Sequence, residues 1–219
     1  MCHGTCILFG CTNLKDKEIN AKKVLEIGSL DINGSLRCYI ESFNPEEYVG
    51  IDIVNGRGVD CICTVENLID EFGTEKFDLV VATEVIEHIK DWKIAISNMK
   101  NICKSDGIIL ITTRSVGFPI HGYPHDYWRF EFNDMEEIFS DCEIVAIEND
   151  HSVPGVFAKI KKPSNFQEND LSDYELYSVI TNKKTKFYPE NEFITSIKFK
   201  IKHYFYSTSK KVFDYLYEF

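Results

Sequence analysis

The segment that most constrains the fold is an apolar run that opens into a polar turn containing glycine. In KVLEIGSLDINGS (residues 23–35), aliphatic residues precede Gly28, and aspartate, asparagine and a second glycine follow it. This pattern predicts a buried strand that ends in a tight turn at the start of a helix. The next apolar segment, YVGIDIV, carries Asp52, 24 residues after Gly28. In doubly wound α/β folds a ligand lies at the ends of such strands, where an acid binds ribose hydroxyls.

Strand-like and helix-like segments alternate along the chain up to residue 162. Short apolar runs predict strands at 23–28, 48–53, 59–63, 77–83, 107–113, 143–148 and 155–162. Helical patterns predict helices at 35–43, 66–73, 91–104 and 133–141, the last with Asn133 as its N-cap. The alternation predicts a doubly wound, Rossmann-like α/β fold with a mostly parallel seven-stranded sheet. We expect its last two strands to pair antiparallel through the turn at 151–155.

Two kinds of adenosine-containing cofactor, dinucleotides and S-adenosylmethionine, bind at such a turn. A pyrophosphate requires glycines at positions 28, 30 and 33, so that backbone amides can approach the phosphates. The chain has Leu30 and Asn33 at two of these positions. Glu26 is unfavourable beside phosphates but favourable beside the sulfonium and ammonium of S-adenosylmethionine. The loop therefore favours S-adenosylmethionine and disfavours the alternative, an NAD-dependent short-chain oxidoreductase or epimerase, whose Tyr-x-x-x-Lys pair is also missing after the fourth predicted strand.

Four segments in register resemble the class I S-adenosylmethionine-dependent methyltransferases. They are VLEIGS, VGIDI, FDLVVATEVIEHI (77–89) and GIILITTRS (107–115), and the resemblance covers roughly residues 22–160. Of the E-x-G-x-G-x-G loop usual in that family, this chain keeps only the acid and the first glycine. The resemblance implies that the cofactor contacts Glu26, Gly28, Ser29, Asp52, Thr64, Val65, Thr83 and Glu84. Glu87 and His88, on the first helical turn after the fourth predicted strand, either assist catalysis or organise the loop.

The long loop after the predicted strand at 107–113 is the place to expect an acceptor site. Its sequence, RSVGFPIHGYPHDYWRFE, is irregular and rich in aromatic and titratable residues, and a loop of this length in a compact domain usually has a function. The part HGYPHDYWRFE also resembles a subgroup associated with small-molecule or sugar methylation. His125 is the first candidate for a general base, because the unperturbed pKa of histidine near 6.5 suits that role. His121 is the second candidate.

The other polar residues of this loop allow several roles. Asp126 could orient the imidazole of His125, act as the base itself or bind a sugar hydroxyl. Tyr127 and Trp128 are candidates for lining the acceptor pocket, and Arg129 for pairing with an acidic substrate. For each of these residues a packing role is the alternative, with Trp128 in the core and Arg129 bridged to Glu131.

The composition and net charge indicate which partners and which cell compartment to expect. The formal net charge is −11, which disfavours nucleic acid because its phosphates would be repelled. No apolar run reaches the ~18 residues of a membrane span, and the start lacks the features of a signal peptide. We therefore expect a cytoplasmic protein whose eight cysteines are free thiols. Cys2, His3, Cys6 and Cys11 form a ligand-like group without the second half usual in zinc sites, so no metal is predicted.

The chain divides, on its composition, near Pro163. Residues 1–163 are predicted to form the catalytic domain, with an N-terminal helix within 1–20 that covers the cofactor pocket. Residues 164–219 form an appendage in which 181–219 carry eight lysines against four acids, interleaved with aromatics. The stretch 193–219 could touch an anionic membrane surface or a partner. We favour packing against the catalytic domain or against a sister subunit in a homodimer.

Three functions remain compatible with the sequence. The leading prediction is an S-adenosylmethionine-dependent methyltransferase acting on a small-molecule or glycan-type acceptor, with oxygen as the target. The second is the NAD-dependent enzyme described above. The third is a non-catalytic module that binds S-adenosylmethionine, a reading that the altered glycine loop allows and that the polar loop at 121–131 disfavours.

Overall fold

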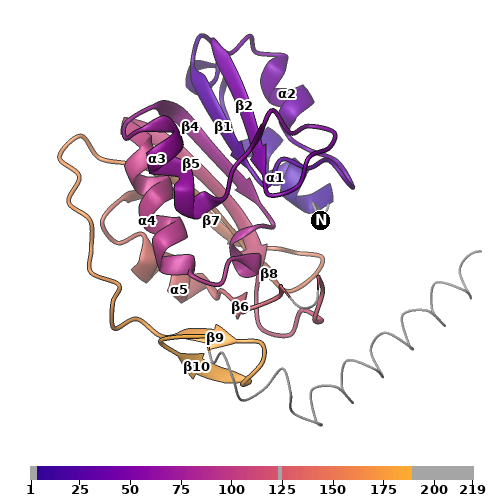
Figure 1. Ribbon diagram of the computed structural model, residues 1–219, viewed down its shortest axis with the longest axis vertical. Helices are drawn as coiled ribbons and strands as arrows, with labels where there is room; N and C mark the ends of the chain where they lie inside the picture. The colour runs from indigo at the N-terminus through magenta and orange to yellow at the C-terminus, as the bar shows by residue number, and fades with distance from the viewer. Residues whose placement is uncertain (1–3, 123–124, 189–219) are drawn as a thin grey trace, which may run out of the picture.

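A seven-stranded sheet organises the protein, which is described by a computed structural model over residues 4–122 and 125–188 (Figure 1). Its strand order is β3-β2-β1-β4-β5-β8-β7. The strands are β1 (Lys23–Ile27), β2 (Glu47–Asp52), β3 (Cys61–Ile62), β4 (Phe77–Thr83), β5 (Cys103–Arg114), β7 (Glu143–Asn149) and β8 (Gly155–Lys161). Strands β1 to β5 run parallel to one another, and β8 runs antiparallel to both β5 and β7. The predicted Rossmann-like architecture is confirmed.

Helices cover both faces of this sheet. They are α1 (Gly4–Asn13), α2 (Arg37–Glu41), α3 (Leu68–Phe72), α4 (Trp92–Ile102) and α5 (Phe132–Ile138), with short 3-10 turns η1 (Asp16–Glu18), η2 (Val65–Asn67) and η3 (Ile86–His88). Residues of α3, α4 and α5 share one hydrophobic cluster with the sheet, and residues of α1 and α2 share the other. In α4, Trp92, Ile96 and Met99 are fully buried, as expected for apolar residues that recur at helical spacing.

The order of the strands determines where a ligand can bind. The chain runs outward from β1 through β2 to β3 at one edge, then returns to β4 on the other side of β1. Connections before and after this reversal cross opposite faces of the sheet, and a crevice opens where they part, beyond the carboxyl ends of β1 and β4. Both strands are almost completely buried, so the crevice has a rigid floor.

A second, three-stranded sheet joins the loop after β5 to the part of the chain beyond residue 163. It has the order β10-β9-β6, with β6 at Trp128–Arg129, β9 at Leu176–Ser178 and β10 at Lys183–Thr185. Leu176 and Ile180 are buried in the same hydrophobic cluster as α4. The packing of the catalytic domain therefore continues past the boundary predicted at residue 163. The tail at 193–219, for which membrane contact was considered, lies outside the described residues.

The predicted N-cap of the helix at 133–141 needs correction. Helix α5 has Glu131 as its N-cap, two residues before the predicted Asn133, and Asp134 completes a capping box by accepting from the Glu131 amide at 2.9 Å. Asparagine is the commoner cap, but Glu131 also accepts from the amide of Val116 at 2.7 Å, a contact between distant loops that the pattern does not reveal. Beyond residue 163, the segment 164–175 contains turns and no helix or strand.

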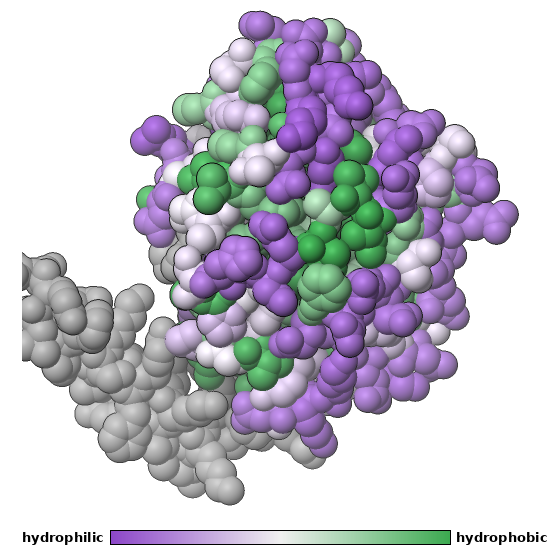
Figure 2. Space-filling view, turned by 180° about the vertical axis from the view of Figure 1, so that it is seen from behind, coloured by the Kyte–Doolittle hydropathy of each residue, from purple (hydrophilic) through white to green (hydrophobic). Residues whose placement is uncertain are grey.

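One face of the molecule, seen from behind relative to Figure 1, carries a hydrophobic patch among mostly hydrophilic side chains (Figure 2). Ile32, Ile53 and Val54 are among the exposed large hydrophobic residues, and all three line the cavity described below. Among the described residues, no helix is both long and apolar enough to cross a membrane.

Candidate active site

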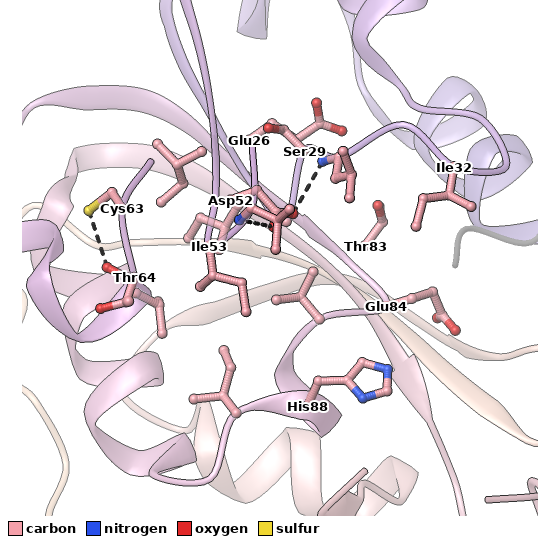
Figure 3. A pocket seen from close by; sticks show the side chains of 18 of the residues that line it. Glu26, Ser29, Ile32, Asp52, Ile53, Cys63, Thr64, Thr83, Glu84 and His88 are labelled. Atoms are coloured by element: carbon pink, nitrogen blue, oxygen red, sulfur yellow. Dashed lines mark hydrogen bonds between the residues drawn. The ribbon is translucent and has the colours of Figure 1, made fainter. Parts of the chain in front are cut away.

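A cavity of about 500 Å³ opens at the carboxyl ends of β1, β2 and β4. All eight residues predicted from the sequence to contact the cofactor line it. Asp52 and Thr64 lie on one side, while Thr83, Glu84 and His88 lie on the other (Figure 3). The sheet topology thus brings together side chains that are separated by as many as 58 residues, from Glu26 to Glu84.

Glu26, near the end of β1, anchors the loop at the cavity. Its carboxylate is buried and accepts hydrogen bonds from the hydroxyls of Ser35 at 2.9 Å and Tyr48 at 2.6 Å. Burial raises the pKa of Glu26, and these two hydroxyls oppose that rise. The acid therefore holds the far end of the glycine loop (Ser35) against β1 and β2.

Gly28 and Ser29 make the turn that follows β1. Gly28 has φ +72°, and a Cβ at this position would lie 2.2 Å from Cγ2 of Val85, so both the backbone and the space require glycine. The amides of Gly28 and Ser29 both donate to the carbonyl of Ile51 at 2.9 Å. The Ser29 hydroxyl is buried and has no hydrogen-bond partner among the described residues. Such an orphaned polar atom beside a cavity is well placed for a ligand.

Asp52 ends β2 with its carboxylate held by the backbone. One oxygen accepts from the amide of Val54 at 3.0 Å and the other from the amide of Leu30 at 3.3 Å. Each oxygen keeps a further lone pair, so the carboxylate can still accept hydrogen bonds from a ligand. Thr64 and Val65 follow β3 and complete this side of the cavity.

Glu84 follows β4 in a left-handed backbone conformation, with φ +58°. Its carboxylate forms a fully buried ion pair with Arg114, which also pairs with Asp150 at 3.1 Å. The thiol of Cys6 on α1 lies 3.4 Å from the same carboxylate. Burial and the nearby Glu87 carboxylate nevertheless raise the pKa of Glu84 to about 10, although Arg114 opposes that rise.

Comparison with known proteins identifies the family. A family model described as a methyltransferase domain matches residues 12–152, nearly two thirds of the chain. The chain belongs to this methyltransferase family. It is a class I S-adenosylmethionine-dependent methyltransferase, and S-adenosylmethionine rather than a dinucleotide is its cofactor.

Solved structures show the same fold at low sequence identity. The 1,6-didemethyltoxoflavin-N1-methyltransferase of Burkholderia thailandensis is 14% identical, with a TM-score of 0.59 over 72% of this chain and 78% of that one. The N-methyltransferase NodS of Bradyrhizobium japonicum is 16% identical, with a TM-score of 0.51 over 66% and 88%. Phosphoethanolamine N-methyltransferase 2 of Haemonchus contortus is 18% identical, with a TM-score of 0.54 over 72% and 51%. A sequence search of curated proteins gives no significant match.

The cavity of this methyltransferase fits its cofactor on three observations. The Asp52 carboxylate offers lone pairs for ribose hydroxyls, and the orphaned Ser29 hydroxyl offers a partner for a polar group. Glu26 places an acid close to the loop, where a cationic cofactor is tolerated. The apolar side chains of Ile53 and Val65 line the cavity near Asp52 and Thr64 and can pack against an adenine ring.

Helix α1, predicted to cover the pocket, lies beside the cavity lining. Ile7 of α1 is close to Gly34 in the loop after β1, and Gly10 packs against Leu36. None of the described α1 residues is among those that line the cavity. Cys6 and Cys11 of the N-terminal cysteine group belong to this helix, whereas Cys2 and His3 lie outside the described residues.

The acceptor loop divides into residues that reach the cavity and residues that hold the loop. Tyr127 lines the cavity. Trp128 is 1% exposed and donates from its indole to the carbonyl of Lys90 at 3.0 Å, so it belongs to the core. Arg129 is 2% exposed and binds Asp126 through two hydrogen bonds, of 2.5 and 2.8 Å. The structure therefore places Trp128 in the core, the alternative given for it, whereas Arg129 is paired with Asp126 and not with Glu131 as that alternative had it.

The histidines of the loop differ sharply in their surroundings. His125 is exposed, does not line the cavity, and has Nδ1 2.9 Å from the hydroxyl of Tyr127. His121 is mostly buried, with Nδ1 3.2 Å from Asp126 and Nε2 3.7 Å from Glu87. Asp126 thus contacts His121 rather than the imidazole of His125, which the sequence analysis had suggested it could orient.

His121 and the carboxylates of Asp126 and Glu87 shift one another's pKa values. Burial lowers the pKa of His121, but the carboxylates of Asp126 and Glu87 outweigh burial and raise it to about 9. Burial raises the pKa of Asp126, but Arg129 and His121 outweigh burial and lower it to about 2. Glu87 is fully buried, and the imidazoles of His121 and His88 hold its pKa below the usual range against the effect of burial.

His88 is the cavity-lining titratable residue that sequence reasoning left undecided between catalysis and loop organisation. It is the last residue of η3, shortly after β4, it lines the cavity, and its ring packs edge-on against His121 with centroids 4.6 Å apart. The signal was present in ATEVIEHI, where an acid and a histidine follow a buried strand at the ligand-binding edge. The pattern could not reveal His121, because this residue lies in the loop after β5, 33 residues further along the chain.

Proposed function

We propose that this methyltransferase transfers the methyl group of S-adenosylmethionine to an oxygen of a small-molecule or glycan-type acceptor. The observation that carries the proposal is that His88, which lines the cavity at the end away from Asp52 (Figure 3), belongs to a histidine–carboxylate cluster with Glu87 and His121. An oxygen nucleophile of neutral charge must lose a proton before or during transfer, and a positioned group that assists contributes roughly 10²–10⁴-fold. A neutral amine needs no such group before it attacks, so the cluster favours a hydroxyl.

The shape of the site supports a small acceptor. The cavity is a hollow between strand ends, lined at one end by His88, Ile89, Lys90 and Tyr127. A hollow of this kind receives a single functional group or a compact molecule rather than the face of a folded protein. Tyr127 offers an aromatic face and a hydroxyl, which suits packing against a sugar or an aromatic ring.

Each part of the chain has a defined task in this proposal. S-adenosylmethionine supplies an electrophilic methyl group when it is bound. Asp52, Ser29 and Glu26 hold it, and Tyr127 with its neighbours excludes water and positions the acceptor, because alignment of the reacting groups accounts for most of the rate in such a displacement. We assign the removal of the acceptor proton to the cluster around His88 rather than to His125, whose ring lies outside the cavity lining.

The test combines binding with product analysis. Calorimetry of the purified chain with S-adenosylmethionine and with NAD should show binding of the first and none of the second. Incubation with a library that pairs hydroxyl compounds and glycans with their amino analogues should then yield products heavier by one methylene unit, and NMR should locate the new methyl group on oxygen. Products methylated only on nitrogen would contradict the choice of oxygen, and turnover of folded protein substrates alone would contradict the small acceptor.

A further inference from the structure

We propose that Glu87, His88 and His121 form a binding site for a divalent transition-metal cation at the acceptor end of the cavity. One carboxylate oxygen and two imidazole nitrogens of these residues lie within 4.8 Å of one another. Oε1 of Glu87 is 3.9 Å from Nε2 of His88 and 3.7 Å from Nε2 of His121. The three atoms therefore enclose one point from three sides and leave the remaining directions open.

The carboxylate of Glu87 is the strongest indication of a missing ligand. Glu87 is 0% exposed, and its Oε1 has no hydrogen-bond partner among the described residues. The other oxygen, Oε2, accepts from the Thr113 hydroxyl at 2.9 Å, which fixes the orientation of the group. A buried carboxylate oxygen without a hydrogen bond, which meets the two imidazoles only at 3.7 and 3.9 Å, is favourably placed to bind a cation.

Both histidines are held so that their Nε2 atoms face Glu87. Nδ1 of His88 lies 2.5 Å from the main-chain carbonyl of His125, and a contact with a carbonyl oxygen requires that Nδ1 carries the proton. Nδ1 of His121 lies 3.2 Å from Asp126, which is itself clamped by Arg129. His88 thus has the arrangement usual for a metal-binding histidine, which donates from one nitrogen to a carbonyl and binds the metal through the other, while Nδ1 of His121 has the Asp126 carboxylate as a close charged neighbour without a hydrogen bond.

The donor set indicates the class of cation. Two imidazoles and one carboxylate, with open positions, suit first-row divalent ions such as Mn²⁺, Fe²⁺, Co²⁺ or Zn²⁺ more than Ca²⁺, which prefers an all-oxygen shell. Metal–ligand bonds of about 2.0–2.2 Å place neighbouring ligand atoms roughly 3.0–3.6 Å apart, so the three side chains must move closer together when the ion binds. The partly exposed His88 side chain has room for that movement.

This site is formed by residues other than those whose spacing in the sequence resembled a metal site. The sequence analysis predicted none, because only the N-terminal cysteine group had ligand-like spacing, and Cys6 of that group instead contacts Glu84. Glu87 and His88 are adjacent in the chain, but His121 comes from the loop after β5. The triad therefore exists only in the folded protein.

The cation would activate the acceptor hydroxyl for methyl transfer, a step that rests on the proposed function. An acceptor hydroxyl that occupies an open coordination position has a lowered pKa, because the cation stabilises the negative oxygen. The O–H bond then breaks, the proton leaves to water, and the electron pair stays on the oxygen that receives the methyl group. The cluster would activate the acceptor through the cation rather than through a free imidazole.

The experiment measures Mn²⁺ binding to the full chain by electron paramagnetic resonance, in which the signal of free aqueous Mn²⁺ disappears on binding. Mn²⁺ is chosen because it prefers nitrogen and oxygen ligands, so the eight cysteines do not compete. We expect one ion per chain. His88→Gln and His121→Gln should each weaken binding by more than ~100-fold, and Asp126→Asn, which removes an outer partner, by about 10–100-fold.

His125→Gln is the matched control, because it removes a histidine of the same loop but keeps the main-chain carbonyl that contacts His88. It should leave Mn²⁺ affinity unchanged. Calorimetry with S-adenosylmethionine and circular dichroism verify that each variant is folded, and if His121→Gln does not fold, the partly exposed His88 decides alone. Absence of Mn²⁺ binding at millimolar metal, or equal binding by His88→Gln and the parent chain, overturns the site.

The same experiment separates this inference from the proposed function. Methylation of a hydroxyl acceptor that persists in EDTA, with no Mn²⁺ bound, overturns the metal site and leaves the function standing. Tight Mn²⁺ binding that depends on His88 and His121, together with methylation on nitrogen only, supports the site and overturns the oxygen acceptor.

Discussion

The two ends of the cavity are built in different ways. At the donor end, Gly28, Asp52 and Thr64 lie at or just after the ends of three neighbouring strands, and the Asp52 carboxylate accepts from the amides of Leu30 and Val54. At the acceptor end, His121 is held by Asp126, and Asp126 by Arg129, whose strand β6 pairs with β9 from beyond residue 163. The donor end is a product of local turns, while the acceptor end depends on a chain of long-range contacts.

This difference separates binding of the donor from the integrity of the acceptor loop. A change in the contacts behind the loop should affect stability and the acceptor end, and leave the donor end intact. A change at a donor turn should do the opposite. From Arg129→Met to His125→Ala the expected effects decrease in size, and each variant changes one end of the cavity or the packing behind it.

Arg129→Met should have the largest effect on stability. It leaves the buried Asp126 carboxylate with only His121 as a charged partner, and breaking a buried ion pair from one side costs about 3–5 kcal/mol. Urea denaturation measures the free energy of unfolding. The double variant Asp126→Asn/Arg129→Met should recover a large part of the loss, and a single-variant loss below ~1 kcal/mol would show that the pair is dispensable.

Leu176→Ala tests whether the segment beyond residue 163 is part of the same packing. Leu176 on β9 is 0% exposed within the main hydrophobic cluster, so truncation should lower the free energy of unfolding by about 2–5 kcal/mol. Leu8→Ala is the control, since Leu8 is 65% exposed and its truncation should change stability by no more than about 0.5 kcal/mol. Equal values for the two variants would restore the boundary at residue 163.

Asp52→Ala addresses the donor end. Loss of a carboxylate that accepts from the cofactor ribose should weaken S-adenosylmethionine binding by roughly 1.5–3 kcal/mol, which is about 10- to 150-fold in the dissociation constant. The free energy of unfolding should change far less than in Arg129→Met. Asp70→Ala removes an exposed acid of α3 and should leave the affinity as it is. Unchanged binding by Asp52→Ala would remove Asp52 from the cofactor site.

His125→Ala should have the smallest effect and distinguishes two candidates for acceptor activation. If the cluster around His88 activates the acceptor, turnover should fall less than the ~10²-fold that marks loss of a general base, while His88→Gln should exceed that factor. Steady-state rates with an identified acceptor at saturating S-adenosylmethionine give the comparison. A fall of ~10²-fold or more in His125→Ala would return the role of base to His125.

The sequence was a good guide wherever one strand and the turn after it carry the information. The strand at 77–83 was predicted with the bounds that the structure shows, and all eight predicted cofactor residues line one cavity. It was a poorer guide at α5, where Glu131 replaces the expected Asn133 as N-cap because it also binds the amide of Val116. Contacts between loops leave no periodic signal in the chain.

The sequence by itself determined the sheet, the donor turns and the family, because apolar periodicity, glycine in a turn and an acid at a strand end act over a few residues. Tertiary structure alone decided which loop residues face the cavity. Trp128 packs in the core and Arg129 holds Asp126, because segments far away in the sequence bury both side chains. His121 came to face Glu87 and His88 for the same reason, since burial and charge pairing depend on neighbours that only folding brings together.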